Sequence, residues 1–219
     1  MESCITFKNL SIGYRSKHQL RAIASAVSAS LQPGELTCLI GANGVGKSTL
    51  LRTLCGFQPA LDGEIFLQDQ PLSAYPAQQL ARQIGVVLTS RVDVPQLSVR
   101  EIVGIGRSPY TNFWGTLTPA DQQIVDEAIH QVGIPHLAQR NISELSDGER
   151  QKTMIAKALA QQTRIIILDE PTAFLDFPSK VETLQMLLRL AHEQHKAILL
   201  STHDVELALQ LADSLWLME

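Results

Sequence analysis

The chain has 219 residues, of which 45% are hydrophobic, and its 18 Lys and Arg residues against 22 Asp and Glu residues give a net charge of -4. This length suits one large domain or one and a half domains, and the negative balance argues against a protein that binds nucleic acid through a broad basic surface. The longest apolar runs, at 36–40 and 165–168, are much shorter than the roughly twenty residues of a membrane-spanning helix, so we expect any membrane contact to go through a partner.

The N-terminal residues and the cysteines indicate the compartment. Met1 to Cys4 lack the basic and apolar regions of an export signal. Cys4, Cys38 and Cys55 are odd in number and show no metal-ligand spacing. We therefore expect a cytoplasmic protein whose cysteines are reduced and mostly structural.

The first third of the chain reads as strands. Apolar residues alternate with polar ones over 5–10 and over 23–31, which predicts two half-buried strands, and a turn at 32–35 separates the second from a buried strand at 36–40. Further strands are predicted at 63–67 and 84–88, and the second of these is apolar enough to be buried on both faces.

The strand at 36–40 runs into a glycine-rich loop that opens a helix. In such a loop the backbone N–H groups turn toward an anion, the helix start adds its positive dipole end, Lys47 reaches the β- and γ-phosphates, and the hydroxyl of Ser48 suits Mg²⁺. The pattern matches Walker A at every fixed position, so we expect a bound nucleoside triphosphate. A plain glycine turn before a helix explains the GK[ST] ending poorly. The loop consists of Gly41, Ala42, Asn43, Gly44, Val45, Gly46, Lys47, Ser48 and Thr49.

Three helix-start signatures follow one another between 92 and 161. Ser98, Thr118 and Ser146 are each followed three residues later by an acidic residue, which is typical of a capping box. No clear strand lies between them, so this stretch is predicted to be a helical insert.

Two buried strands return after the insert, at 164–168 and 197–200, and each is followed by polar residues. The carboxyl ends of parallel strands are where open α/β sheets bind ligands. Asp169 is suited to hold Mg²⁺, Glu170 to polarise the attacking water, and His203 to hydrogen-bond a γ-phosphate oxygen. Taken alone, an acidic pair after a strand is more often the start of a solvated loop, and a lone histidine at a strand end is more often structural. For the acidic pair, the Walker A loop earlier in the chain makes the functional interpretation the better one.

The stretch 145–151, Leu-Ser-Asp-Gly-Glu-Arg-Gln, closely resembles the LSGGQ signature of ABC ATPases, with Asp147 and Glu149 as variants. The purely structural interpretation of this stretch is a helix N-cap at Ser146, with Glu149 completing the capping box. The resemblance extends in order over nearly the whole chain: Tyr14 resembles the aromatic that stacks on adenine, Asp176 the D-loop aspartate, and His203 the switch histidine. The nucleotide-binding set that it implies is Tyr14, residues 41–49, Ser146, Asp147, Gly148, Glu149 and Asp176, with Glu170 and His203 catalytic and with Ser48 and Asp169 on Mg²⁺.

The resemblance implies an α/β fold of the P-loop NTPase class, namely an ABC-type nucleotide-binding domain with a parallel core sheet, an antiparallel β-subdomain and a helical subdomain. We expect a single domain over 1–219, with the core and β-subdomain at about 1–91 and 162–219 and the helical subdomain at about 92–161. Members of this family usually continue past the strand predicted at 215–219, so apolar surface is expected to be exposed at that end.

One position departs from the family pattern. The Q-loop glutamine should follow the strand at 84–88, but the register gives Thr89 there. The Thr89 hydroxyl can approach Mg²⁺, although its arm is shorter. Gln96 is the right residue type and lies out of register.

The family works by pairing two cassettes head to tail, so that the signature helix of one copy completes the ATP site of the other. The resemblance therefore implies an ATPase with ATP and Mg²⁺ as cofactors and a second copy of the chain as partner. The permease subunits of a membrane transporter are further partners, and the substrate-binding protein is an indirect one. No nucleic acid is expected. Such a protein lies at the cytoplasmic face of the inner (plasma) membrane and is soluble when isolated.

The stretch Gly104-Ile105-Gly106-Arg107-Ser108-Pro109-Tyr110, followed by Asp121 and a helix, resembles the GR-x-P stretch of ATPases that serve iron-siderophore, haem and cobalamin importers. The sequence thus predicts the energising subunit of such an importer. The alternatives are a soluble ABC ATPase of DNA repair, chromosome structure or translation, a phosphate-loop kinase or GTPase, and an exporter cassette. Soluble ABC ATPases usually carry two cassettes in one chain or a long coiled coil. In a phosphate-loop kinase or GTPase, the signature stretch at 145–151 would have no role.

Overall fold

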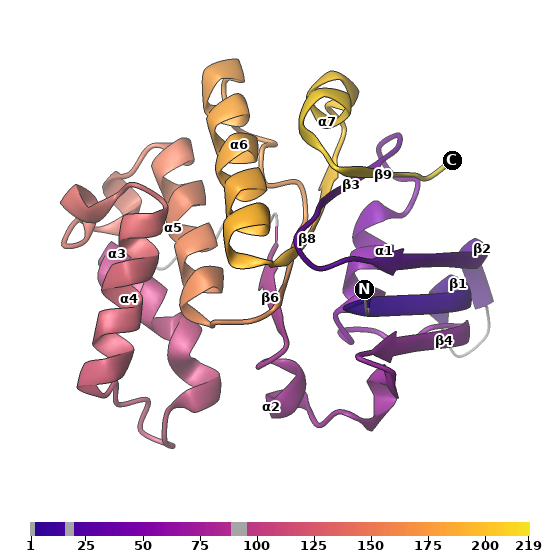
Figure 1. The fold of residues 1–219 in the computed structure, drawn as a ribbon, viewed down its shortest axis with the longest axis horizontal. Helices are drawn as coiled ribbons and strands as arrows, with labels where there is room; N and C mark the ends of the chain where they lie inside the picture. The colour runs from indigo at the N-terminus through magenta and orange to yellow at the C-terminus, as the bar shows by residue number, and fades with distance from the viewer. Residues whose placement is uncertain (1–2, 16–19, 89–95) are drawn as a thin grey trace.

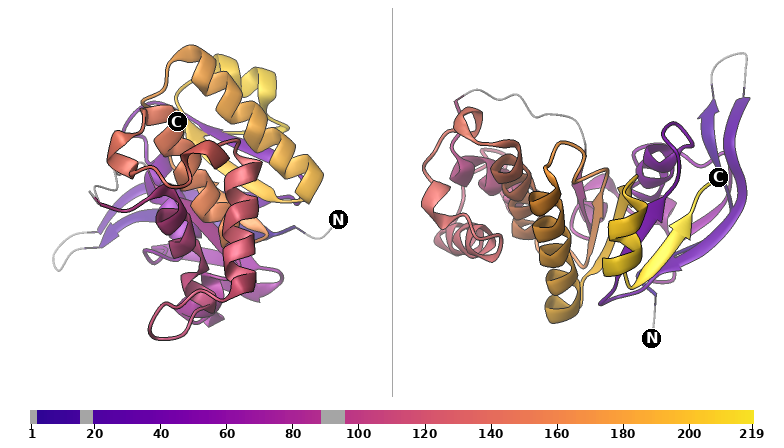
Figure 2. Two further views of the ribbon diagram at one scale, coloured as in Figure 1. Left: turned by 90° about the vertical axis from the view of Figure 1, so that its left-hand side faces the viewer. Right: turned by 90° about the horizontal axis from the view of Figure 1, so that it is seen from above.

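The computed structural model describes residues 3–15, 20–88 and 96–219. An antiparallel sheet lies at one end of the molecule, a parallel sheet in the middle and a group of helices at the other end (Figure 1). The right-hand view of Figure 2 shows the same order of layers from above. This arrangement confirms the predicted fold class.

The antiparallel sheet has the strand order β2-β1-β4-β5. It consists of β1 (Ile5–Arg15), β2 (Leu20–Leu31), β4 (Asp62–Leu67) and β5 (Gln70–Pro71). The first two strands are longer than the sequence indicated. The alternation also breaks at Ala26, which has φ 56°, so Ser25 is exposed while Leu31 is buried. Irregular pairing with β1 is the physical reason, because the register shifts between Leu10 and Ile12.

The parallel sheet has the order β6-β7-β8-β3-β9. Alternate residues of β7 face different cores: Ile166 and Leu168 pack with the helices, whereas Ile165 and Ile167 pack with the antiparallel sheet. The strand is buried throughout because both of its faces are covered. The five strands are β3 (Leu36–Ile40), β6 (Ile84–Val87), β7 (Ile165–Leu168), β8 (Ala197–Thr202) and β9 (Ser214–Leu217).

The predicted capping boxes all start helices. Ser98, Thr118 and Ser146 each accept from the backbone N–H three residues on, and the acid at that position accepts from the N-cap backbone in return. The helices are α3 (Val99–Gly104), α4 (Pro119–Gln131) and α5 (Asp147–Ala160), joined by the 3₁₀ turns η2 (Ile105–Tyr110), η3 (Pro135–Leu137) and η4 (Ile142–Glu144). The limits of the subdomains stay a prediction.

The other helices cover the parallel sheet or follow its strands. They are α1 (Lys47–Leu54), α2 (Ala77–Leu80), α6 (Phe177–Gln194) and α7 (Val205–Leu211), with a 3₁₀ turn η1 at Leu72–Ala74. Among the residues that the structure describes, no helix is long and apolar enough to cross a membrane.

Arg107 ties the helical group together. Its Nε donates to Asp121 Oδ1 at 2.9 Å, and one of its terminal nitrogens donates to the carbonyl of Ala160 at 2.8 Å and to Gln162 Oε1 at 3.0 Å. The guanidinium also lies over the ring of Tyr110, 4.2 Å from its centroid. Arg107 therefore links η2, α4 and the end of α5 through one buried side chain.

Gly106 allows η2 to approach α5 closely. A Cβ at this position would lie 2.2 Å from the carbonyl oxygen of Lys157. The Gly-Arg pair thus has a packing role, in which glycine permits the close approach and arginine makes the contacts.

Candidate functional site

Three neighbouring parallel strands end at one edge of the central sheet. Ile40 at the end of β3 pairs with Thr202 at the end of β8, and Leu168 at the end of β7 pairs with Leu200. The residues that follow these strands are the glycine-rich loop, the acidic pair and His203. The predicted site residues on these three segments are therefore brought to one place.

The glycine-rich loop has a backbone that only glycine adopts readily. Gly44 has φ 81° and Gly46 has φ 116°. A Cβ on Gly46 would lie 2.3 Å from Cγ2 of Ile23, whereas one on Gly44 would meet no atom within 4 Å. The loop is thus packed against β2 at Gly46 and has open space above Gly44.

Lys47 is buried, with 5% of its side chain exposed. Its ammonium group donates to the carbonyl oxygens of Gly41 at 2.7 Å and Ala42 at 3.2 Å. It also lies 3.8 Å from Glu170 Oε1. A buried cation is therefore held inside the curve of the loop and next to one of the two acids.

Ser48 and Asp169 are in direct contact. The Ser48 hydroxyl donates to Asp169 Oδ1 at 2.9 Å, and the hydroxyl of Ser201 donates to the same oxygen at 2.8 Å. Asp169 itself is buried. These bonds fix the carboxylate beside the first turn of α1.

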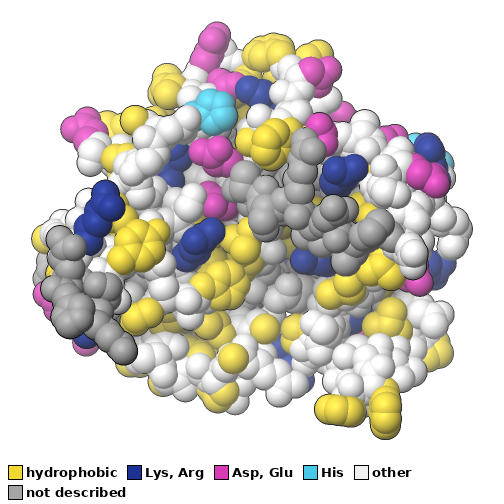
Figure 3. Space-filling model, turned by 180° about the vertical axis from the view of Figure 1, so that it is seen from behind, with side chains coloured by type: hydrophobic (Ala, Val, Ile, Leu, Met, Phe, Trp, Pro, Cys, Tyr) yellow, Lys and Arg dark blue, Asp and Glu magenta, His cyan; other side chains and the backbone are white. Residues whose placement is uncertain are grey.

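Glu170 has an unusual backbone, with φ 46°. Its N–H donates to Ser201 Oγ at 2.9 Å, and its Oε2 lies 3.8 Å from Nδ1 of His203. The carboxylate thus lies between the Lys47 ammonium and the His203 ring. On this face of the molecule, acidic, basic and histidine side chains lie close together (Figure 3).

Ser201 was not recognised from the sequence. It is fully buried on β8 and contacts both acids of the site, accepting from the backbone of Glu170 and donating to Asp169. A buried serine near the end of an otherwise mostly apolar strand is a weak signal, because its partners follow the neighbouring strand.

The loop and the acidic pair fit a nucleotide and a magnesium ion. The space over Gly44 and the buried Lys47 ammonium suit a phosphate group. Within 3–15, 20–88 and 96–219 no three His, Cys, Asp or Glu side chains cluster to hold a metal ion. Mg²⁺ takes few protein ligands and keeps waters and substrate phosphates, and Ser48 and Asp169, which are in direct contact, suit that role.

A family comparison decides the identity of this fold and site. The sequence pattern of the family described as "ABC transporter" matches residues 24–173, more than half of the chain. The chain belongs to the ABC transporter family.

Individual ABC proteins resemble the chain over most of its length. An uncharacterised ABC transporter ATP-binding protein of Methanocaldococcus jannaschii is 41% identical over 97% of this chain and 72% of its own length. The iron(3+)-hydroxamate import ATP-binding protein of Bacillus subtilis is 35% identical over 92% of this chain and 73% of its own. The ferric enterobactin transport ATP-binding protein of Escherichia coli is 33% identical over 95% and 75%.

A solved structure shows the same fold. The protein cbiO1 of Clostridium perfringens, part of the ABC transporter complex cbiONQ, superposes with a TM-score of 0.87 over all of this chain and 86% of its own, at 26% identity. The chain is thus an ATP-binding and ATP-hydrolysing subunit of an ABC transporter. These relatives do not favour a soluble, non-transport ABC ATPase.

The ABC signature stretch begins α5. The Ser146 hydroxyl donates to Glu149 Oε2 at 2.8 Å and accepts from the Glu149 backbone at 3.3 Å. The hydrogen bonds from Ser146 hold the pKa of the Glu149 carboxyl below its ordinary value. The N-cap predicted at Ser146 is therefore present, and Ser146 is exposed at the start of the helix.

Tyr14 and Asp176, two further residues predicted to bind the nucleotide, lie at the end of β1 and at the start of α6. The Tyr14 hydroxyl is 3.1 Å from Thr49 Oγ1, so the end of β1 reaches the start of α1. Asp176 is the N-cap of α6, and its hydrogen bonds with Ser179 lower the pKa of its carboxyl. Thr89 lies outside the described residues, and Gln96 is described and exposed.

Proposed function

We propose that this chain hydrolyses ATP to drive an importer of a metal chelate. The carrying observation is the convergence of Lys47, Glu170 and His203 at one sheet edge, with Lys47 and His203 each 3.8 Å from the Glu170 carboxylate. Three polar groups on separate segments meet there next to a phosphate-binding loop, as hydrolysis of a phosphoanhydride requires.

The residues of the loop divide the work of holding the nucleotide. Gly41 to Gly46 offer backbone N–H groups to the phosphates, and the Lys47 ammonium neutralises the β- and γ-phosphate oxygens. Ser48 and Asp169 hold the magnesium ion, whose charge stabilises the oxygens of the transferred phosphoryl group. Tyr14, which is half exposed next to Thr49, offers its ring to the adenine base.

Glu170 orients and polarises the attacking water, and His203 contacts the γ-phosphate. We expect Glu170→Gln to bind ATP with nearly unchanged affinity, to accumulate a closed dimer and to lose most of its turnover, because the amide keeps the shape and loses the base. Glu193→Gln, at an exposed site on α6, is the matched control. Unchanged ATP hydrolysis in Glu170→Gln would remove Glu170 from this role.

A second copy of the chain completes each site. The exposed N-terminus of α5 at Ser146 has the positive end of the helix dipole, which suits an anion. In the closed dimer it faces the γ-phosphate of the other copy, with Asp176 at the same interface. We expect Ser146→Arg to bind ATP and to be inactive, whereas Ser30→Arg, exposed on β2, stays active. If Ser146→Arg also lost ATP binding, the signature would act within its own chain.

The cargo class follows from the relatives and from the Gly-Arg stretch. Relatives named for import of iron(3+)-hydroxamate and transport of ferric enterobactin are 35% and 33% identical to this chain over the aligned residues. We infer that the chain docks on membrane permease subunits at the cytoplasmic face of the plasma membrane, and that a substrate-binding protein delivers a ferric siderophore, haem or cobalamin to the permease.

Reconstitution tests the cargo. The chain and the permease that co-purifies with it are placed in proteoliposomes, and uptake of radiolabelled ferric hydroxamate is measured with and without ATP. ATP-dependent uptake that disappears with Glu170→Gln supports the proposal. Robust ATP hydrolysis by the complex without uptake of any ferric chelate, haem or cobalamin would contradict the cargo class and leave the ATPase assignment standing.

A further inference from the structure

The ends of β1 and β2 form a wall beside the nucleotide loop. The Tyr14 hydroxyl lies 3.1 Å from Thr49 Oγ1 at the start of α1. On β2, Cγ2 of Ile23 would lie 2.3 Å from a Cβ on Gly46, so this strand borders the glycine-rich loop directly. Both strands therefore reach the space next to a nucleotide that is bound to the loop.

Arg21 stands directly opposite Tyr14 in this wall. The two residues are partners across β1 and β2, and the pairs next to them keep the same register. Directly opposite residues of an antiparallel pair lie on one face of the sheet, with Cβ atoms about 4.5–5.5 Å apart. Since the Tyr14 hydroxyl is directed at α1, the Arg21 side chain leaves the sheet on the side of α1 and the loop. It is exposed there, and so it is accessible to a ligand.

The position of Arg21 along β2 separates it from the phosphates. The phosphate groups lie over the glycine-rich loop, where the buried Lys47 ammonium already provides a cation. Arg21 precedes Ile23 by two residues, which places its Cα about 6–7 Å closer to the start of the strand. Arg21 is therefore next to Tyr14, the residue proposed to contact adenine, rather than next to Lys47.

The chemistry of the side chain suits a purine base. A guanidinium is planar, stacks on aromatic rings and donates hydrogen bonds in a rigid fork. Adenine has an aromatic face and a ring nitrogen that accepts hydrogen bonds. With the Tyr14 ring against one face of the base, a guanidinium beside it would hold the base in one orientation.

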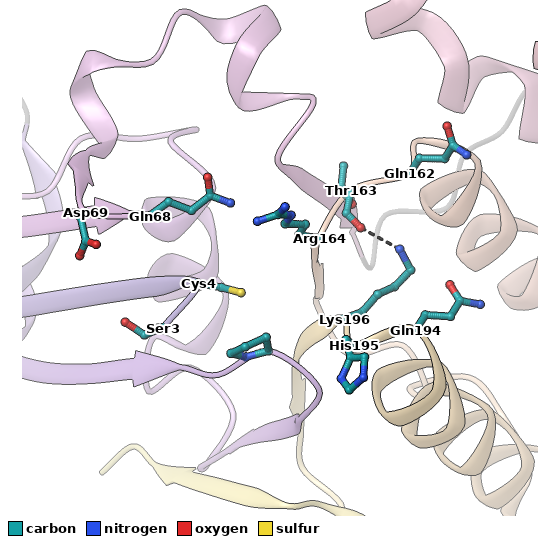
Figure 4. A pocket seen from close by; sticks show the side chains of 11 residues that line it. Ser3, Cys4, Gln68, Asp69, Gln162, Thr163, Arg164, Gln194, His195 and Lys196 are labelled. Carbon is teal, nitrogen blue, oxygen red and sulfur yellow. Dashed lines mark hydrogen bonds between the residues drawn. The ribbon is translucent and has the colours of Figure 1, made fainter. Parts of the chain in front are cut away.

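A cationic side chain needs such a neighbour to form a site. At the opposite edge of the sheet, Arg164 and Lys196 line a cavity of about 620 Å³. Their charged groups point to opposite sides of the backbone before β7 (Figure 4), so they do not converge on one ligand. Arg21 differs from these two residues because its cross-strand partner is itself a candidate ligand-binding residue.

We propose that Arg21 binds the purine base of the nucleotide together with Tyr14 and thereby determines the affinity of the site for the adenosine half of ATP. This role of Arg21 rests on the proposed binding of adenine at Tyr14. Lys47 and the loop hold the phosphates, whereas Tyr14 and Arg21 hold the other end of the same molecule.

Isothermal titration calorimetry of the full chain with ADP and Mg²⁺ tests this role, because ADP carries the base and is not hydrolysed. We expect Arg21→Gln to raise the Kd for ADP about fivefold. Arg21→Lys should recover only part of this loss, since an ammonium lacks the planar fork. Arg15→Gln is the matched control: Arg15 is exposed and follows Tyr14 directly, so it lies on the other face of the sheet. It should bind ADP as the wild type does.

A double-mutant cycle with Tyr14→Leu locates the contact. If both side chains hold one base, Arg21→Gln should cost less than about twofold in the Tyr14→Leu background, because the base is no longer fixed there. An undiminished loss in that background would place Arg21 on the phosphates and overturn the proposal. Equal losses in Arg21→Gln and Arg15→Gln, or wild-type affinity of Arg21→Lys, would reduce the effect to charge and overturn it as well.

The cycle also separates this role from the proposed adenine site. Wild-type affinity of Tyr14→Leu would refute the binding of adenine at Tyr14, and the role of Arg21 would fail with it. Weakened binding by Tyr14→Leu with wild-type affinity of Arg21→Gln would overturn the role of Arg21 alone. Because Arg21 is exposed, the variant is expected to fold, and its melting temperature without ADP verifies this.

Discussion

Replacing Asp121 by Asn removes the negative partner of Arg107 and keeps the size of the side chain. The two side chains are 10% and 6% exposed, and their N–O distance is 2.9 Å. Breaking a buried pair from one side leaves the other charge uncompensated, at a cost of about 3–5 kcal/mol. Because Arg107 retains its bonds to Ala160 and Gln162, we expect a loss near the lower limit, about 3 kcal/mol in the free energy of unfolding.

Urea unfolding followed by circular dichroism measures this loss. Asp126→Asn is the matched control, since Asp126 also lies on α4 and pairs with Arg100 at 2.6 Å, with side chains 44% and 37% exposed. An exposed pair of this kind contributes at most about 1 kcal/mol. If Asp121→Asn and Asp126→Asn cost the same, the assignment of Arg107 as the link between η2, α4 and α5 would be wrong.

The same variant has a defined pH dependence. Hydrogen bonds from Thr118, and then from Arg107, lower the pKa of the Asp121 carboxyl in the folded protein. A lowered folded pKa contributes stability above the unfolded pKa, about 4, and this contribution is lost as the pH falls through the folded value. The difference in stability between the wild type and Asp121→Asn should therefore narrow below about pH 4.

Three further predictions concern the site and the core. Ser201→Ala removes one hydrogen bond to each acid of the site, so we expect turnover in an ATPase assay to fall at least about tenfold. The free energy of unfolding, measured in urea, should fall by about 1–3 kcal/mol. Full activity would show that Ser201 does not position Asp169 or Glu170. Gly46→Ala should lower the melting temperature more than Gly44→Ala does, because a Cβ on Gly46 would clash with Ile23 of β2, whereas one on Gly44 would meet no atom of the protein. Equal losses of stability would contradict the packing argument. Burial raises the pKa of Cys38 and of Cys55 to about 12, so both thiols should resist a thiol reagent at pH 8 until the protein is denatured, and rapid labelling of the native protein would contradict their burial.

The sequence predicted the elements whose signals are local. The strand over 165–168 was recognisable because both faces of it are apolar, and α3, α4 and α5 because each begins with a capping box. The edge of the sheet that carries Lys47, Asp169 and His203 also followed from strand order and polarity alone. The resemblance to a known family then gave these residues specific roles, which remain predictions here.

Features that depend on distant residues could not be predicted. Ser201 is 32 positions from Asp169 and contacts it only because β7 and β8 are neighbours. Arg164 and Lys196 line one cavity because each stands just before one of these strands, although their charged groups point apart. The break at Ala26 arises from the pairing of β2 with β1, and the alternation of the single strand contains no trace of it.

The left-handed backbone of Glu170 has a consequence for the evolution of stability in this chain. A residue with a side chain in this conformation costs of order 1 kcal/mol or more relative to one that adopts it readily, such as glycine or asparagine. We therefore expect Glu170→Asn to raise the melting temperature while it abolishes turnover. Glutamate at position 170 would then make the protein less stable than asparagine would, and selection for activity would be the reason that it is kept.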